Sequence, residues 1–110
     1  YIDVIPGIGI DPISNELPSD FRLEQNYPNP FNPVTKIKFS LPKSSEQGAQ
    51  EVKLAVYDIN GREVSIIVNE NLSPGTYDYE FNGSNYSSGV YFFRLISGKF
   101  NDVKKMVLLK

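Results

Sequence analysis

The sequence predicts an all-β protein, an immunoglobulin-like antiparallel β-sandwich of about seven strands. Short runs that alternate apolar and polar residues recur about every twelve residues from Phe21 onward, with turn residues between them. Aromatic residues, which favour sheets, make up 13% of the chain. No segment has the apolar spacing of a helix of two turns. A small barrel is the alternative architecture.

The first expected strand covers residues 21–24. A bend follows at residues 26–33, where three prolines remove amide donors and fix the backbone, so this stretch is expected to be irregular and rigid. Residues 35–41 then alternate cleanly, as is typical of a half-buried strand. The chain therefore enters its sheet through a proline-rich bend.

The middle of the chain predicts a hairpin and an aromatic strand. Residues 51–57 alternate, and Asn60-Gly61 after them predicts a type I′ turn that folds residues 63–68 back. A turn at residues 72–75 leads into residues 76–81, whose three aromatic side chains are expected to share one face: Tyr77, Tyr79 and Phe81.

Residues 89–96 are apolar on both faces except at Arg94, which predicts a central strand covered on both sides. Ser97-Gly98 turns the chain into the last strand, residues 100–109. The inward-facing positions of the expected strands predict the core, which contains Ile37, Phe39, Val52, Leu54, Val56, Tyr91, Phe93 and Leu95.

The 110 residues suffice for one domain of ordinary size. Residues 1–20 contain prolines and glycines among isolated Ile and Val without a sustained period, which indicates a linker or the tail of a preceding domain. Residues 21–110 are the expected folded domain. Because the chain starts at Tyr1 without a signal-peptide pattern, it is interpreted as a piece of a longer protein.

Composition narrows the function classes. The chain has no cysteine and no histidine, which excludes thiol nucleophiles, zinc–thiolate sites and the commonest general base. Its net charge of −2 gives no positive field for nucleic acid. The apolar runs fall far short of the roughly 20 residues that span a bilayer. We expect no enzyme activity, no cofactor and no metal.

Three groups of side chains allow alternative interpretations. The carboxylates are interpreted as solvated surface charges rather than an acid–base pair: Asp58, Glu63, Asp78 and Glu80. Tyr27, Tyr57 and Tyr86 either stack on sugar rings or pack at a sheet rim. The Lys104-Lys105 pair either discourages edge pairing of an ordinary last strand or forms part of an end that a receptor reads. In the second case the lysines would meet acidic groups of the receptor, and the apolar tail at residues 106–109 would add a strand to the receptor's sheet.

Five segments in fixed order carry a family resemblance. They are residues 27–33 (YPNPFNP), 56–64 (VYDINGREV), 72–77 (LSPGTY), 87–91 (SSGVY) and 104–110 (KKMVLLK). In this order they resemble the type A C-terminal sorting domains of the type IX secretion system, which occur on proteins that Bacteroidetes and related bacteria export across the outer membrane. The resemblance covers approximately Leu23 to Lys110.

The resemblance implies a sandwich that marks its covalently linked N-terminal cargo in the periplasm for the outer-membrane translocon. It also implies that a sortase-like signal peptidase at the cell surface removes the domain, in or near residues 13–21, and attaches or releases the cargo. The recognition part is expected at residues 89–110. The residues that carry the family's motifs are Pro28, Asn29, Pro30, Gly89, Tyr91, Lys104, Lys105, Met106, Val107, Leu108 and Leu109.

Two other function classes remain alongside this one. A carbohydrate-binding or adhesive accessory module of a secreted enzyme would present an aromatic platform on one exposed face. A purely structural spacer would tolerate loss of residues 89–110 without loss of export.

Overall fold

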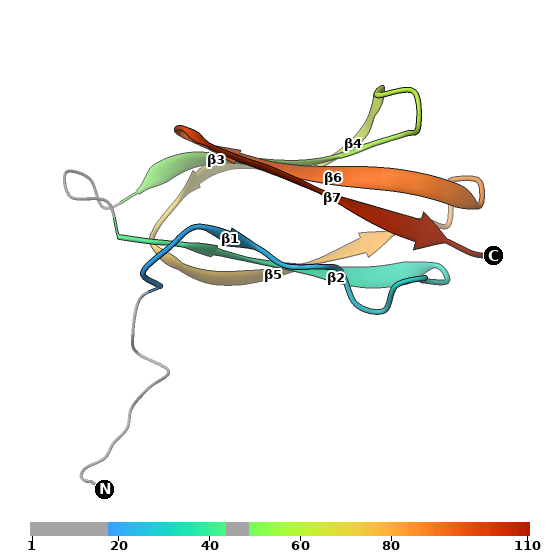
Figure 1. The fold of residues 1–110 in the computed structure, drawn as a ribbon, viewed down its shortest axis with the longest axis horizontal. Helices are drawn as coiled ribbons and strands as arrows, with labels where there is room; N and C mark the ends of the chain where they lie inside the picture. Colours follow the sequence, from blue (N-terminus) through green and yellow to red (C-terminus); the bar gives the residue numbers. More distant parts are fainter. Residues whose placement is uncertain (1–17, 44–48) are drawn as a thin grey trace, which may run out of the picture.

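The computed structural model describes residues 18–43 and 49–110, which form a sandwich of two antiparallel sheets (Figure 1). The seven strands are β1 (Arg22–Leu23), β2 (Val34–Leu41), β3 (Gln50–Tyr57), β4 (Glu63–Leu72), β5 (Gly75–Asn82), β6 (Gly89–Ser97) and β7 (Phe100–Leu108). One sheet has the order β1-β2-β5 and the other β4-β3-β6-β7. The predicted antiparallel sandwich of seven strands is confirmed. These described residues include no helix, hence none that could span a membrane.

Two expectations fall mostly outside the described residues. They are the linker or tail at residues 1–20 and the cleavage segment in or near residues 13–21.

The core lies between the two sheets, where alternate residues of each strand point inward. All eight core residues expected from the sequence are buried, with Tyr91 the most exposed at 9%. Seven further apolar residues complete the core: Leu23, Phe31, Leu41, Val68, Phe81, Met106 and Leu108. The expected aromatic face of β5 is also confirmed, since Tyr77 and Tyr79 stack on Phe39 at centroid distances of 5.5 and 5.8 Å.

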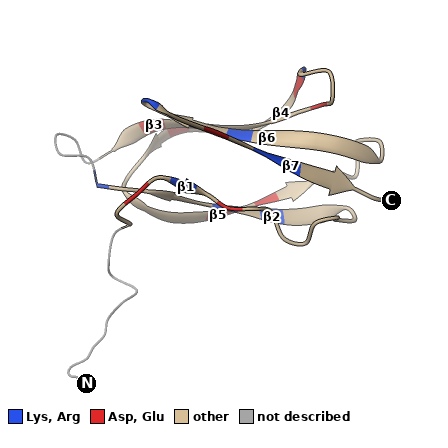
Figure 2. Ribbon diagram, in the orientation of Figure 1, with Lys and Arg blue, Asp and Glu red and all other residues tan. Residues whose placement is uncertain are grey.

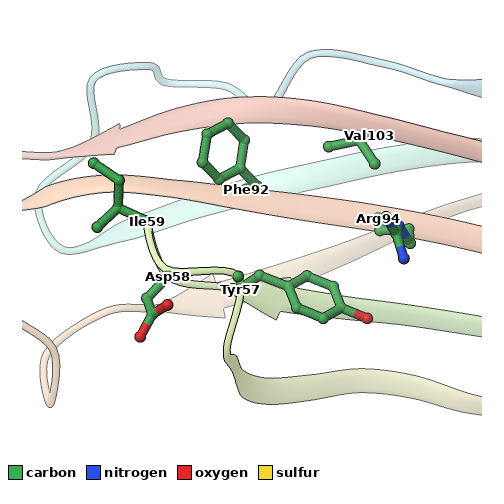
Figure 3. A pocket seen from close by; sticks show the side chains of 7 residues that line it. Tyr57, Asp58, Ile59, Phe92, Arg94 and Val103 are labelled. Atoms are coloured by element: carbon green, nitrogen blue, oxygen red, sulfur yellow. The ribbon is translucent and has the colours of Figure 1, made fainter.

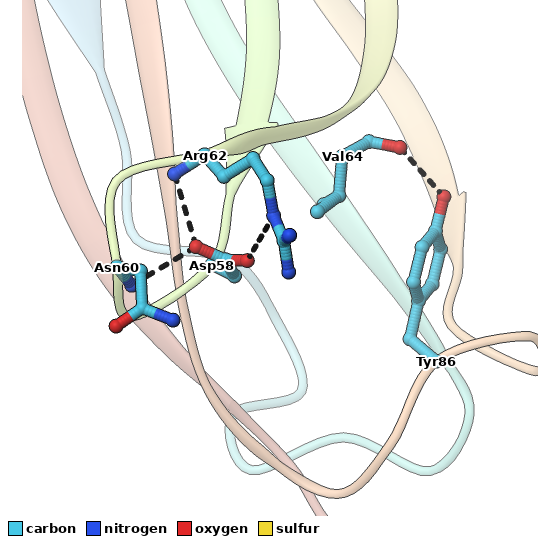
Figure 4. Close-up of polar contacts among 5 residues, drawn as sticks. All are labelled: Asp58, Asn60, Arg62, Val64 and Tyr86. Atoms are coloured by element: carbon cyan, nitrogen blue, oxygen red, sulfur yellow. Dashed lines mark hydrogen bonds and ion pairs between the residues drawn. The ribbon is translucent and has the colours of Figure 1, made fainter.

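The turn between β3 and β4 differs from the expected type I′ hairpin. Gly61 N donates to Asp58 O at 3.0 Å, so Ile59 and Asn60 occupy the turn corners and Gly61 follows them with φ of 84°. This is a turn followed by a left-handed bulge residue. The Asp58 carboxylate selects it by accepting hydrogen bonds from Asn60 N at 2.9 Å and Arg62 N at 3.0 Å (Figure 4).

Two turns that enter the aromatic strands have the same geometry. Gly75 and Gly89 begin β5 and β6 with φ of 150° and 149°, values that favour glycine. Two residues later Tyr77 and Tyr91 donate their hydroxyl protons to backbone carbonyls four residues upstream, at 2.6 and 2.8 Å. Each tyrosine therefore fixes the turn before its own strand, much as a tyrosine corner does.

Strand β6 is central, but the described residues cover only one of its faces. It lies between β3 and β7, and its inward side chains Tyr91, Phe93 and Leu95 are buried. The outward ones, among them Phe92 and Arg94, are only half-buried. The expectation of a strand covered on both sides is therefore wrong for the outer face, although the residue pattern on that face is apolar.

Candidate functional site

The proline-rich bend and the last strand, far apart in the sequence, lie against each other. Phe31 N donates to Val107 O at 2.9 Å, and Leu109 N donates to Phe31 O at 2.9 Å, which makes a short parallel bridge. Asn29 Oδ1 accepts from Val107 N at 3.0 Å, and Gln25 Nε2 donates to Lys105 O at 2.7 Å. The bend thus occupies the outer edge of the C-terminal half of β7.

A buried polar pair and one aromatic ring hold the bend in place. Asn26 is 2% exposed, and its Nδ2 donates to Thr35 Oγ1 at 3.0 Å and to Pro28 O at 3.1 Å. Thr35 Oγ1 donates in turn to Pro28 O at 2.8 Å. Phe31 is 1% exposed and packs edge-on against Phe81. The sequence pattern did not predict these contacts. The signal for them in the sequence is Phe31, an aromatic residue among polar residues and prolines.

The Gly89 turn joins the same region. Gly89 pairs with Leu108 across the β6–β7 ladder, and Lys110 N donates to Ser88 Oγ at 3.0 Å. We call residues 25–31, 87–91 and 105–110 together the bend–tail site. It brings together all the motif residues expected from the sequence except Lys104, which lies one position before it.

Within this site, the last strand has two different faces. Met106 and Leu108 are fully buried in the core. The sequence-based view that the apolar tail offers its side chains and backbone to a receptor sheet therefore does not fit the folded domain. Val107 N, Val107 O and Leu109 N already have partners in the bend, and Leu109 is the exposed apolar residue of the tail at 53%.

The two lysines of the expected pair point to opposite faces. Lys104 is opposite Phe93 and shares the inward-facing side of the strand, where it is half-buried near the sheet edge. Lys105 is opposite Phe92 and is exposed on the outer face. A flat receptor surface can therefore contact Lys105 without contacting Lys104.

The acidic side chains do not converge, in agreement with their interpretation as surface charges. Asp58 pairs with Arg62, whose backbone N–H lowers the pKa of the carboxyl group, and Glu63 pairs with Lys53 at 2.9 Å and raises the pKa of that amine. Asp78 and Glu80 point outward on β5. Across the two described ranges, no three acidic side chains gather as a metal site requires.

The three tyrosines considered for sugar stacking also lie apart. Tyr86 packs against Phe81 and donates its hydroxyl proton to Val64 O at 3.0 Å (Figure 4). Tyr27 bridges to β2 and is 81% exposed, whereas Tyr57 ends β3 in the other sheet. These three tyrosines form no shared platform.

The chain matches the model of a known protein family. Residues 25–109 match the family described as "Secretion system C-terminal sorting domain". No curated protein and no solved structure matches the chain. The family match covers the bend, six of the seven strands (β2 to β7) and nearly all of the tail.

Proposed function

The chain belongs to the family of type IX secretion system C-terminal sorting domains, and from this premise we propose that its folded bend–tail site is the part that the outer-membrane translocon reads. Membership makes the domain a sorting signal for secretion toward the outer membrane or the extracellular space, in a family that is not one of enzymes. The match over residues 25–109 is the observation that carries the proposal.

Further steps of the proposal concern the route of the cargo. Residues 1–20 are the linker or tail of the preceding cargo domain, and residues 21–110 are the sorting domain. The cargo passes through the periplasm, crosses the outer membrane through the translocon and meets a sortase-like signal peptidase at the surface. The peptidase cuts in or near residues 13–21, and the cargo is then attached to the surface or released.

The geometry supports recognition of a folded surface rather than addition of a strand. An added strand would need free backbone groups on the edge of β7, and the bend already pairs with those of Val107 and Leu109. What the tail offers instead is the exposed side chains of Lys105 and Leu109 beside the rigid Pro28-Asn29-Pro30 bend. A single exposed lysine adds little energy, so the shape of the whole site must contribute.

The proposal is tested by fusing residues 1–110 behind a periplasmic reporter. The fusion is expressed in a host that carries the type IX system and in the same host without its translocon. We expect reporter at the surface, accessible to added protease, only in the first host. Retention in both hosts, or surface delivery in both, would overturn the proposal.

A pair of surface variants then tests the site itself. Lys105→Glu with Leu109→Asp changes side chains that are exposed, and should lower delivery about tenfold or more without unfolding the domain. Lys38→Glu, an equally exposed charge reversal on β2, is the matched control and should leave delivery unchanged.

A further inference from the structure

The outer faces of the two sheets differ in chemistry. On the three-stranded sheet, Lys36 lies opposite Glu80 and Lys38 opposite Asp78, and all four side chains are exposed. Such opposite-charge pairs are typical of a face that meets water. On the four-stranded sheet, Lys53 and Glu63 form an ion pair on the β3–β4 side of the outer face, whereas β6 and β7 carry mostly apolar side chains there, from Val90 and Phe92 to Val103 and Val107.

A shallow groove runs across this apolar face, between the β3–β4 turn and β7 (Figure 3). Its lining includes Tyr57, Ile59, Phe92, Arg94 and Val103. Ile59 is 71% exposed and Val103 is 42% exposed, and the two lie toward opposite ends of the groove with Phe92 between them. The groove volume is about 240 Å³. Small-molecule pockets span about 300–1,000 Å³, so side chains of a protein fit this groove better than a cofactor.

Arg94 lies within this groove with incomplete hydrogen bonding. Its guanidinium carbon lies 5.6 Å from the centre of the Tyr57 ring, a cation–π contact. Its Nε is buried and has no hydrogen-bond partner within residues 18–43 and 49–110. Because Nε is buried, a partner that docks on the surface would meet the terminal amino groups of Arg94 rather than this atom.

The charges around the groove favour an acidic partner. Asp58 is the nearby carboxylate that lines the groove, and Arg62 and two backbone N–H groups already occupy it. Lys105 is the cross-strand neighbour of Phe92 and adds a second positive charge on the same face. The basic segments of β6 and β7 lie side by side in Figure 2. A carboxylate placed over Arg94 would accept two hydrogen bonds from the guanidinium fork.

We propose that this groove is a second docking surface, which receives a carboxylate flanked by apolar side chains from a protein of the outer-membrane translocon. The proposal rests on the sorting function and extends the recognised surface from the tail across β6 to the β3–β4 turn. A lipid surface fits less well, because the chain carries a net charge of −2 and the groove presents one guanidinium rather than a basic cluster.

The test measures binding of the purified 1–110 chain to detergent-solubilised translocon. Arg94→Gln keeps much of the side-chain volume and removes the charge, and Ile59→Asp alters an exposed turn residue that the core does not need. Arg94→Gln should weaken binding about tenfold or more because the desolvated charge pair is lost. Ile59→Asp should weaken it by a similar factor because the apolar contacts around that pair are lost. Arg94→Lys should restore part of the affinity, since it retains charge without the fork. Lys38→Glu is the control and should bind as the wild type does.

Thermal unfolding of each variant shows whether its fold is intact. If Arg94→Gln proves unstable, the affinity of Ile59→Asp for the translocon tests the docking surface instead. Unchanged affinity of Ile59→Asp, or an equal loss with Lys38→Glu, would overturn the docking surface. The docking surface would also be overturned if the wild-type chain used Arg94 to self-associate or to bind liposomes or glycans. If the tail variants lose binding and the groove variants do not, the sorting function stands and this inference alone fails. A wild-type chain that neither binds nor exports contradicts both.

Discussion

Leu108 and Leu109 are neighbours in the tail, and the structure predicts opposite roles for them. Leu108 is fully buried, and a Cβ atom at Gly83 would come within 3.0 Å of its side chain, so its surroundings are tightly packed. Leu109 is 53% exposed. Leu108→Ala should therefore destabilise the domain, whereas Leu109→Ala should not.

The magnitude follows from the burial. Truncating a fully buried leucine costs about 2–5 kcal/mol, because the transfer free energy is lost and a cavity remains. For a domain of this size about 1 kcal/mol shifts the melting temperature by roughly 4–8 °C, so a mid-range loss lowers it by about 20 °C. An exposed substitution such as Leu109→Ala stays within about 0.5 kcal/mol.

Thermal unfolding followed by circular dichroism measures both variants. If Leu108→Ala melted within about 3 °C of the wild type, or if Leu109→Ala fell as far as Leu108→Ala, the assignment of the tail to the core would be wrong. The same reasoning makes deletion of the tail after Asp102 a poor test of recognition. That deletion removes both Met106 and Leu108 from the core. The expected loss of stability, about 4–10 kcal/mol, is comparable to the whole free energy of unfolding of a typical domain, about 5–15 kcal/mol.

Three other predictions concern single side chains. Asn29→Ala removes the acceptor for Val107 N and should cost about 0.5–1.5 kcal/mol in urea unfolding; no change would show that the bend does not hold the tail. Tyr91→Phe and Tyr77→Phe remove equivalent hydroxyl bonds and should each lower stability by a similar amount, with export following stability; loss of export by Tyr91→Phe at unchanged stability would make that hydroxyl a direct contact. The pKa of Asp58 is lowered by the Arg62 backbone N–H, so its contribution is present above the unfolded value of about 3.9 and disappears as pH falls through the lower folded value. Asp58→Asn should therefore melt earlier than the wild type at pH 7 and alike in strong acid, and a difference that persists in strong acid would contradict this.

Much of the fold could be predicted because period-two patterns are local. Residues 35–41 and 51–57 show which side chains face inward without reference to any partner, and the five expected core residues of these two segments are buried accordingly. The β3–β4 turn was predicted incorrectly because Asn-Gly favours a type I′ turn. The Asp58 carboxylate adds three hydrogen bonds that favour the longer loop, and a rule about two residues does not include them.

The arrangement of the site could not be predicted in the same way. Asn29 and Val107 are 78 residues apart, and no local pattern indicates that the bend closes the edge of β7. The hydrogen bond between Asn26 and Thr35 could not be predicted from the sequence either. An asparagine that is buried and hydrogen-bonded in the fold looks like an ordinary loop residue in the sequence. The apolar outer side of β6 was read as a covered face, and the described residues leave it open.

The central claim is that the translocon reads a folded surface whose tail is held in place by the bend. The most direct measurement compares surface delivery of the reporter fused to the wild-type chain with that of the Lys105→Glu, Leu109→Asp variant, after both are shown to melt at the same temperature. Delivery of the variant should fall about tenfold or more. Equal delivery by two equally stable domains would contradict it.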